Sequence, residues 1–389
     1  IKGERRGNKS IIRGNLNDDE KKYSVYQFKR KVGGKSQYYG DKQYGNLKMK
    51  RKYKGDSDYV PCVINFKRIG DVPKKVVSKD DRKVTEININ SKNTNDDIAL
   101  LNNDGKNQKV RVELRNLESI SNGLIIVVPS STPNMDDELY YEKQVSKHGY
   151  ATAIVYGAEP RYQKKFTGSY TSSMILYDAI ATIDEISKQY GKLKEVILIG
   201  SSTGSLAIFK AGWQKYRDTF SVMENISKVF MINAACPDTF EGELNKDIMI
   251  YAINGKDDDS TPGWVCNNLK KSKNYSNIIL LSYDGAHHFE SDHYGKTKFE
   301  AKGKHLLPTC SINYKKNLHS VVKVRNSEKQ RDAEEKGFNK EHRKWIYNNC
   351  LKEGNYQGYD KKGATDFWKD VRSIIKDRAQ PQELIGFTN

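Results

Sequence analysis

Apolar and polar residues follow two alternating patterns from about residue 108 onward. Runs such as GLIIVVP, ATAIVYG and EVILIG are short and continuously apolar, which is typical of buried strands. Between them, DDELYYEKQVSKHGY and YTSSMILYDAIATIDEISKQYG have the spacing of amphipathic helices. Strands that are apolar throughout have to be covered on both faces. The alternation therefore predicts an α/β domain with a mostly parallel sheet and helices on both sides.

The first 95 residues have a different pattern. They are rich in Lys, Tyr, Gly and Asn, and short β-prone pieces alternate with Gly and Asp turns. We expect residues 1–95 to form a β-rich or partly irregular extension. The α/β domain is then expected to span 96–389, with a charged insertion at about 296–350.

Positive charge is concentrated at the two ends of the chain. The net charge is +18, and residues 1–80 hold 22 Lys and Arg against 9 Asp and Glu. Residues 81–295 are slightly acidic, with 24 basic and 28 acidic residues. A nucleic-acid enzyme is usually basic around its working site, so no specific nucleic-acid partner is predicted. The basic ends indicate either an ordinary solvated surface or attachment to an anionic surface or polymer. The Tyr-Lys interleaving is compatible with binding to carbohydrate or nucleic acid and with self-assembly.

The apolar run EVILIG ends in Gly200-Ser201-Ser202-Thr203-Gly204 before a helical pattern begins. Two interpretations fit this G-x-S-x-G pattern. It is either a simple connection between a strand and a helix, or a tight turn that exposes a nucleophilic serine. Small flanking residues let the backbone pass close to its neighbours, and the central hydroxyl is exposed above the strand ends. The pattern predicts Ser202 as a nucleophile, with the amide of Thr203 directed at a developing oxyanion.

An acid and a base follow Ser202 in the order that this type of site requires. GKDDDSTP, after the apolar run DIMIYAING, holds three aspartates, and YDGAHHFES places two of the seven histidines after the next apolar run. Nucleophile, acid and base in this order predict a Ser-Asp-His triad.

These segments together resemble the dienelactone hydrolase group of the α/β-hydrolases, and especially its exported members, from about residue 110 to 385. The resemblance lies in GLIIVVPSSTPNMDDELYYEKQVSKHGYATAIV, AEPRY, GKDDDSTPGWVC, YDGAHHFES and CLKEGNYQGYDKKGATDFWKDVRSII. It implies an α/β-hydrolase fold, with Asp258 as the acid and Asp257 and Asp259 as loop residues. It also implies His288 as the base, by its distance from Gly285-Ala286, and His287 is the alternative.

The oxyanion loop departs from the common family pattern. Where many members have His-Gly-x-Gly-Gly, this chain has Pro129-Ser130-Ser131-Thr132-Pro133. Proline has no N–H group to donate, so Ser130 or Ser131 is expected to supply the second donor beside Thr203.

Five widely spaced cysteines contain no CxxC pair, and no metal site is predicted. The resemblance implies a Cys236–Cys266 disulfide beside the site, and a Cys310–Cys350 disulfide would close off the insertion. Cys62 is then left free, and the alternative is five buried thiols. We expect a secreted or periplasmic protein whose signal peptide has been removed.

The function predicted from these observations is cleavage of an ester or related acyl bond in a small molecule, through an acyl-enzyme and with no cofactor. A peptidase of the same fold is one alternative. The other is a non-catalytic binding or structural protein that uses its basic N-terminal region to attach to a surface, polymer or partner. Arg161 is expected either to reach a substrate carboxylate or to form a structural salt bridge.

Overall fold

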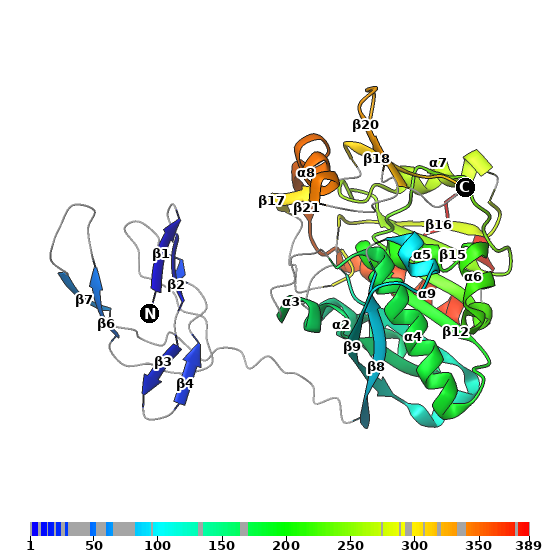
Figure 1. Cartoon of the computed structure of the whole chain (residues 1–389), viewed down its shortest axis with the longest axis horizontal. Coiled ribbons are helices and arrows are strands. Elements are labelled where there is room, and N and C mark those ends of the chain that lie inside the picture. Colours follow the sequence, from blue (N-terminus) through cyan, green and yellow to red (C-terminus); the bar gives the residue numbers. More distant parts are fainter. Residues whose placement is uncertain are drawn as a thin grey trace. The chain divides into compact units, whose positions relative to one another are not determined.

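Eight strands form one sheet in the larger of two compact units, which spans residues 82–389; the smaller unit spans 1–81 (Figure 1). The computed structural model describes residues 2–6, 9–13, 15–18, 21–24, 28–29, 47–51, 60–64, 82–94, 96–130, 135–163, 170–273, 275–287, 289–291, 298–305, 308–316, 320–332, 340–377 and 380–388.

The sheet has the strand order β16-β15-β13-β12-β10-β11-β9-β8. From β11 to β16 all neighbouring strands are parallel, whereas β9 is antiparallel to both β11 and β8. The carboxyl ends of six strands therefore lie along one edge, as expected for a largely parallel sheet. The bounds are β8 (Val84–Asn93), β9 (Lys106–Arg115), β10 (Leu124–Val128), β11 (Ala151–Val155), β12 (Val196–Ser201), β13 (Ile226–Ile232), β15 (Met249–Gly255) and β16 (Ile278–Tyr283).

Helices pack on both faces of the sheet, because alternate side chains of each central strand point to opposite sides. Along β10, Ile125 and Val127 contact the apolar cluster of α2 and α9, while Ile126 contacts that of α4, α5 and α7. These five helices are α2 (Asp136–Val145), α4 (Ser172–Tyr190), α5 (Thr203–Lys210), α7 (Gly263–Lys273) and α9 (Lys361–Ile375). The shorter helices are α1 (Asp97–Leu101), η1 (Leu117–Asn122), α3 (Ala158–Gln163), α6 (Gln214–Thr219), η2 (Ser221–Asn225) and η4 (Pro381–Glu383).

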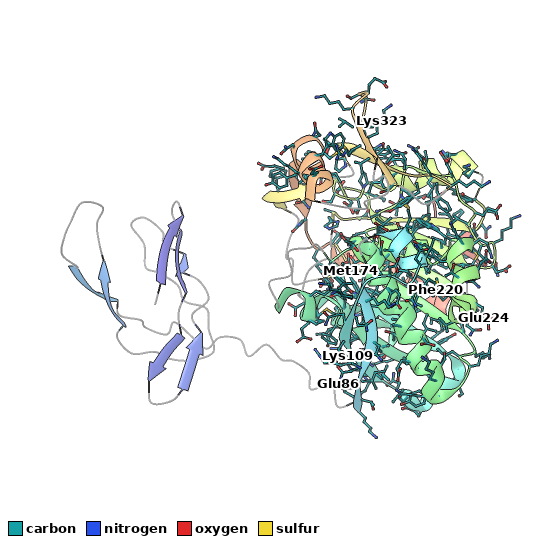
Figure 2. The ribbon with its side chains drawn as sticks, in the orientation of Figure 1. Glu86, Lys109, Met174, Phe220, Glu224 and Lys323 are labelled. Atoms are coloured by element: carbon teal, nitrogen blue, oxygen red, sulfur yellow. A yellow bond between two sulfur atoms is a disulfide. The ribbon has the colours of Figure 1, made fainter. Side chains whose placement is uncertain are left out.

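The sheet begins earlier in the chain than the sequence pattern indicates. Strand β8 pairs with β9 along its whole length, from Val84 opposite Arg115 to Asn93 opposite Lys106, so the sheet includes the end of the stretch 1–95, where the sequence predicts only an extension. Polar residues such as Glu86 and Lys109 point outward from this hairpin (Figure 2). The pairing depends on contacts with β9, and β8 alone has too few apolar residues to indicate a buried strand.

The described backbone of the 1–81 unit forms short antiparallel pairs. One three-stranded sheet has the order β1-β2-β5, and two hairpins pair β3 with β4 and β6 with β7. The strands are β1 (Lys2–Arg6), β2 (Lys9–Arg13), β3 (Asn15–Asp18), β4 (Lys21–Ser24), β5 (Phe28–Lys29), β6 (Leu47–Arg51) and β7 (Val60–Ile64).

Two disulfides join distant parts of the larger unit. Cys236, after β13, is bonded to Cys266 on α7, and Cys310 at the start of β18 is bonded to Cys350 after α8. The second disulfide closes a region in which β14 joins β18, β19 and β20, and β17 pairs with β21. Its elements are β14 (Thr239–Phe240), β17 (Lys298–His305), β18 (Cys310–Tyr314), β19 (Ser320–Val324), β20 (Gln330–Asp332), α8 (Lys340–Asn349) and β21 (Lys352–Gln357).

Candidate active site

Ser202 lies on a strained turn between β12 and α5. Its backbone angles are φ 54° and ψ −115°, a conformation that L-residues rarely adopt. The glycines on either side have no room for a side chain. A Cβ atom on Gly200 would lie 2.8 Å from the carbonyl oxygen of Gly204, and one on Gly204 would lie 2.6 Å from that of Pro129. The small residues of the motif are therefore required by close backbone packing.

Hydrogen bonds from neighbouring strands fix this turn. The amide of Ser202 donates to the carbonyl of Ile232 over 3.0 Å. The Ser205 hydroxyl donates to the Ser202 carbonyl over 2.6 Å and accepts from the amide of Ala235 over 2.8 Å. These hydrogen bonds hold Ser202 in its strained backbone conformation. Such a conformation persists only where the surrounding structure fixes it.

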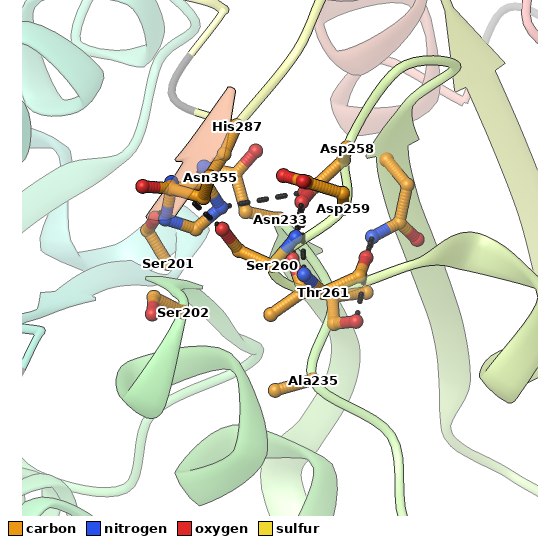
Figure 3. Close-up of polar contacts among 12 residues, drawn as sticks. Ser201, Ser202, Asn233, Ala235, Asp258, Asp259, Ser260, Thr261, His287 and Asn355 are labelled. Carbon is orange, nitrogen blue, oxygen red and sulfur yellow. Dashed lines mark hydrogen bonds and ion pairs between the residues drawn. The ribbon is translucent and has the colours of Figure 1, made fainter. Parts of the chain in front are cut away.

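Asp258 lies in the loop after β15, and its carboxylate is held by its own loop. It accepts hydrogen bonds from the amides of Ser260 and Thr261, over 2.9 and 2.8 Å, and from the Thr261 hydroxyl over 2.7 Å (Figure 3). Burial alone would raise the pKa of Asp258, but the neighbouring His287 and these hydrogen bonds outweigh it and lower the pKa. The carboxylate is therefore ionised and oriented.

His287 faces this carboxylate from the loop after β16. Its Nδ1 lies 3.4 Å from Oδ2 of Asp258, and the side chain is buried (Figure 3). Burial would lower the pKa of His287, but the charges of Asp258 and Glu290 raise it above the ordinary value. His288, the base that the family resemblance favours, lies outside the described residues. The structure thus places the alternative, His287, beside the acid.

The amides of the expected oxyanion donors differ in their hydrogen-bond partners. Thr203 is the first residue of α5, so its amide has no partner four residues earlier within the helix. The amide of Ser130 donates to Oε1 of Glu138 over 2.8 Å, and it is therefore engaged by that side chain. Burial raises the pKa of Glu138 to about 8. Ser131 lies outside the described residues.

Strand β21 runs beside two loops of the candidate site. They are the loop after β15 that carries Asp258, here called the acid loop, and the loop after β16 that carries His287, here called the base loop. The Asn355 side chain donates to the Ser260 hydroxyl over 2.8 Å (Figure 3). The amide of Tyr356 donates to Asp259 over 2.9 Å. Gln357 forms a backbone bridge with His287. The strand begins two residues after Cys350, so the second disulfide anchors an element that contacts the candidate site.

Arg161 forms a structural salt bridge, which is one of the two roles expected from the sequence; the other is contact with a substrate carboxylate. Its guanidinium is fully buried and donates to both carboxylate oxygens of Asp178, over 2.7 and 3.0 Å. It also donates to the Gly157 carbonyl over 2.6 Å and to Asn93 over 2.7 Å. The buried charge is thus paired and hydrogen-bonded, which is the condition for burying it.

Three buried side chains behind the turn at Ser202 had no signal in the sequence. They are Tyr141 on α2, Asn233 after β13 and Glu290 in the loop that carries His287, and they form a connected hydrogen-bond network. Glu290 lies three residues after His287, but no motif indicates its role.

In the part of the chain that the structure describes, no cluster of three or more His, Cys, Asp or Glu side chains is arranged to hold a metal ion. No helix among the described residues is long and apolar enough to cross a membrane.

A mostly parallel eight-stranded sheet with helices on both faces, and a strained serine on the turn between a central strand and its helix, define an α/β-hydrolase fold. No family model matches the sequence, and no curated protein matches it.

Solved structures of this class are similar over about half of the chain. A hydrolase from Agrobacterium vitis S4 has 15% sequence identity over 55% of this chain and 95% of that chain, with a TM-score of 0.37. A dienelactone hydrolase from Klebsiella pneumoniae has 11% identity over 55% and 91% of the two chains, and a TM-score of 0.37. An esterase from Pyrococcus furiosus has 14% identity over 57% and 88%, and a TM-score of 0.37.

Proposed function

We propose that the protein is a serine hydrolase that cleaves an ester or a related acyl bond, with Ser202 as nucleophile, His287 as base and Asp258 as acid. The observation that carries this proposal is the Asp258–His287 contact at the sheet edge where the turn exposes Ser202. The strand order, the strained turn and the ionised carboxylate all support it. His288 remains the competing base, because the resemblance favours it.

The reaction proceeds in two halves. The Ser202 oxygen attacks the substrate carbonyl while Nε2 of His287 accepts the hydroxyl proton, and Asp258 stabilises the resulting imidazolium through Nδ1. The amide of Thr203 donates to the oxyanion. The imidazolium then protonates the leaving group, and an acyl group stays on Ser202. Water, deprotonated by His287, hydrolyses this acyl-enzyme and restores the serine.

The two disulfides favour an oxidising compartment, so we propose that the protein acts in a periplasm or outside the cell. Small-molecule esters are the proposed substrates, and a peptide bond is the competing one because a triad alone does not separate the two. Turnover of matched ester and amide substrates distinguishes them.

The test is covalent labelling with a fluorophosphonate, followed by mass spectrometry of the intact chain and its peptides. The expected result is an adduct on Ser202 that is absent in Ser202→Ala. His287→Gln should slow labelling by roughly a thousandfold or more, whereas the matched His288→Gln should react like the wild type. The reverse pattern would assign the base to His288. A folded wild-type chain without an adduct would refute the hydrolase and favour a binding protein that attaches through its basic N-terminal region.

A further inference from the structure

A fully buried carboxyl group lies behind the proposed catalytic residues. Glu290 is 0% exposed, and its Oε1 accepts hydrogen bonds from the Tyr141 hydroxyl and from Nδ2 of Asn233, the latter over 3.3 Å. Among the described contacts, its Oε2 has no hydrogen-bond partner. Burying a carboxyl group with one oxygen unsatisfied costs stability, so this arrangement calls for a functional explanation.

The same network reaches the turn that carries the nucleophile. Nδ2 of Asn233 also lies 3.2 Å from the Ser201 hydroxyl, and Ser201 directly precedes Ser202. Asn233 has a left-handed backbone, with φ 47°, and it follows Ile232, whose carbonyl accepts the Ser202 amide. A continuous path therefore runs from the end of β12, through Asn233, to the loop that carries the base.

The titratable groups around Glu290 come from two elements. Helix α2 presents Tyr141 and Asp137, and the base loop presents His287, while Ser201 and Asn233 from the strand ends are neutral. Burial raises the pKa of Glu290 to about 7, and Asp137 acts in the same direction. The hydrogen bond from Tyr141 and the charge of His287 oppose this rise. With a pKa of about 7, the Glu290 carboxyl group changes charge near neutral pH.

We propose that Glu290 is a positioning residue of the hydrolase site: its hydrogen bonds with Asn233 and Tyr141 fix the end of β12 and helix α2 against the loop that carries His287. The negative charge of the Glu290 carboxylate also stabilises the protonated imidazole of His287. This inference rests on the proposed function for its catalytic consequence, but the coupling between the two side chains is a property of the folded chain alone.

The first measurement is the NMR titration of the His287 imidazole in the full chain, assigned by the signal that disappears in His287→Gln. Glu290→Gln keeps the shape and removes the charge, so the pKa of His287 should fall by about 0.5–1 unit. Tyr141→Phe removes the donor that favours the carboxylate, so it should lower the pKa of His287 by a smaller amount. The exposed Glu243→Gln is the matched control and should leave the titration unchanged.

The second measurement is the pH profile of fluorophosphonate labelling at Ser202. The acid limb in Glu290→Gln should move to lower pH with the imidazole titration, and kcat on an ester should fall roughly tenfold at unchanged KM. An unchanged His287 titration in folded Glu290→Gln and Tyr141→Phe proteins would overturn the inference. A wild-type chain that is not labelled would overturn the proposed function instead, and the NMR titration would still decide whether Glu290 and His287 are coupled.

Discussion

The carboxylate of Asp258 and the imidazole of His287 are 3.4 Å apart, on loops that follow the neighbouring strands β15 and β16. Two backbone amides and one hydroxyl of the acid loop already fix this carboxylate, so its position does not depend on the histidine. A carboxylate held in this way selects the imidazole tautomer that leaves Nε2 ready to accept a proton.

Replacing Asp258 by Asn should therefore reduce kcat by about 10³–10⁴-fold with little change in KM, because the imidazole loses its orienting acceptor. The neighbouring, exposed Asp257→Asn is the control and should retain activity. Steady-state kinetics on an ester that labels at Ser202 make the comparison. Equal losses in both variants would mean that the loop, and not this carboxylate, matters.

The same carboxylate should make stability depend on pH in acid. The pKa of Asp258 is lower in the folded chain than its ordinary value, so its contribution is present above that value and is lost as the pH falls through the folded pKa. Urea unfolding between pH 6 and pH 3 should show a smaller acid loss for Asp258→Asn than for the wild type. Parallel curves for the two proteins would contradict the lowered pKa.

Glu138 should produce the opposite dependence. Its pKa is raised from 4.5 to about 8 by burial, so the folded chain holds this proton where the unfolded chain has lost it. Its stabilising contribution is complete below pH 4.5 and is lost as the pH rises toward 8, by at most about 1.4 kcal/mol per pH unit. Glu138→Gln should therefore match the wild type in urea at pH 5 and exceed it at pH 8.5. The exposed Glu243→Gln should show no such gain.

Gly204→Ala should destabilise the turn that carries Ser202. The new Cβ would meet the Pro129 carbonyl at 2.6 Å, and relieving this clash should cost about 1–3 kcal/mol and abolish labelling of Ser202. Gly149→Ala is the control, because that position has open space and only a left-handed backbone, with φ 81°, which costs about 1 kcal/mol. Normal labelling of a folded Gly204→Ala chain would show that the turn tolerates the shift.

The strands, the main helices and the turn at Ser202 could be predicted from the sequence because each rests on a local pattern. Apolar runs and helical spacing are read within one window, and G-x-S-x-G requires only adjacent small residues. The position of Asp258, in a loop at the carboxyl ends of the parallel strands, could be predicted from its order in the chain and from the resemblance of its loop. Strand β8 could not, since its partly polar sequence forms a strand of the sheet only through pairing with β9.

The rest of the site depends on contacts between distant elements. His287 and His288 are adjacent in a loop, where no periodicity decides which side chain points to the acid. Glu290 and Tyr141 are 149 residues apart and meet only after the sheet is assembled. Likewise, nothing in the oxyanion loop shows that the Ser130 amide is engaged by Glu138.

The Cys310–Cys350 disulfide should hold β21 against the acid loop. Replacing both cysteines by Ser should lower stability by about 2–4 kcal/mol, because the bond constrains the unfolded chain. The amide of Tyr356, which donates to Asp259, should then exchange its hydrogen faster under native conditions. A Cys236→Ser/Cys266→Ser variant is the matched control, since it removes a disulfide of similar span (30 against 40 residues) that does not adjoin β21. An equal loss of hydrogen-exchange protection at the Tyr356 amide in both variants would mean that the effect is global and that the Cys310–Cys350 disulfide does not specifically hold β21.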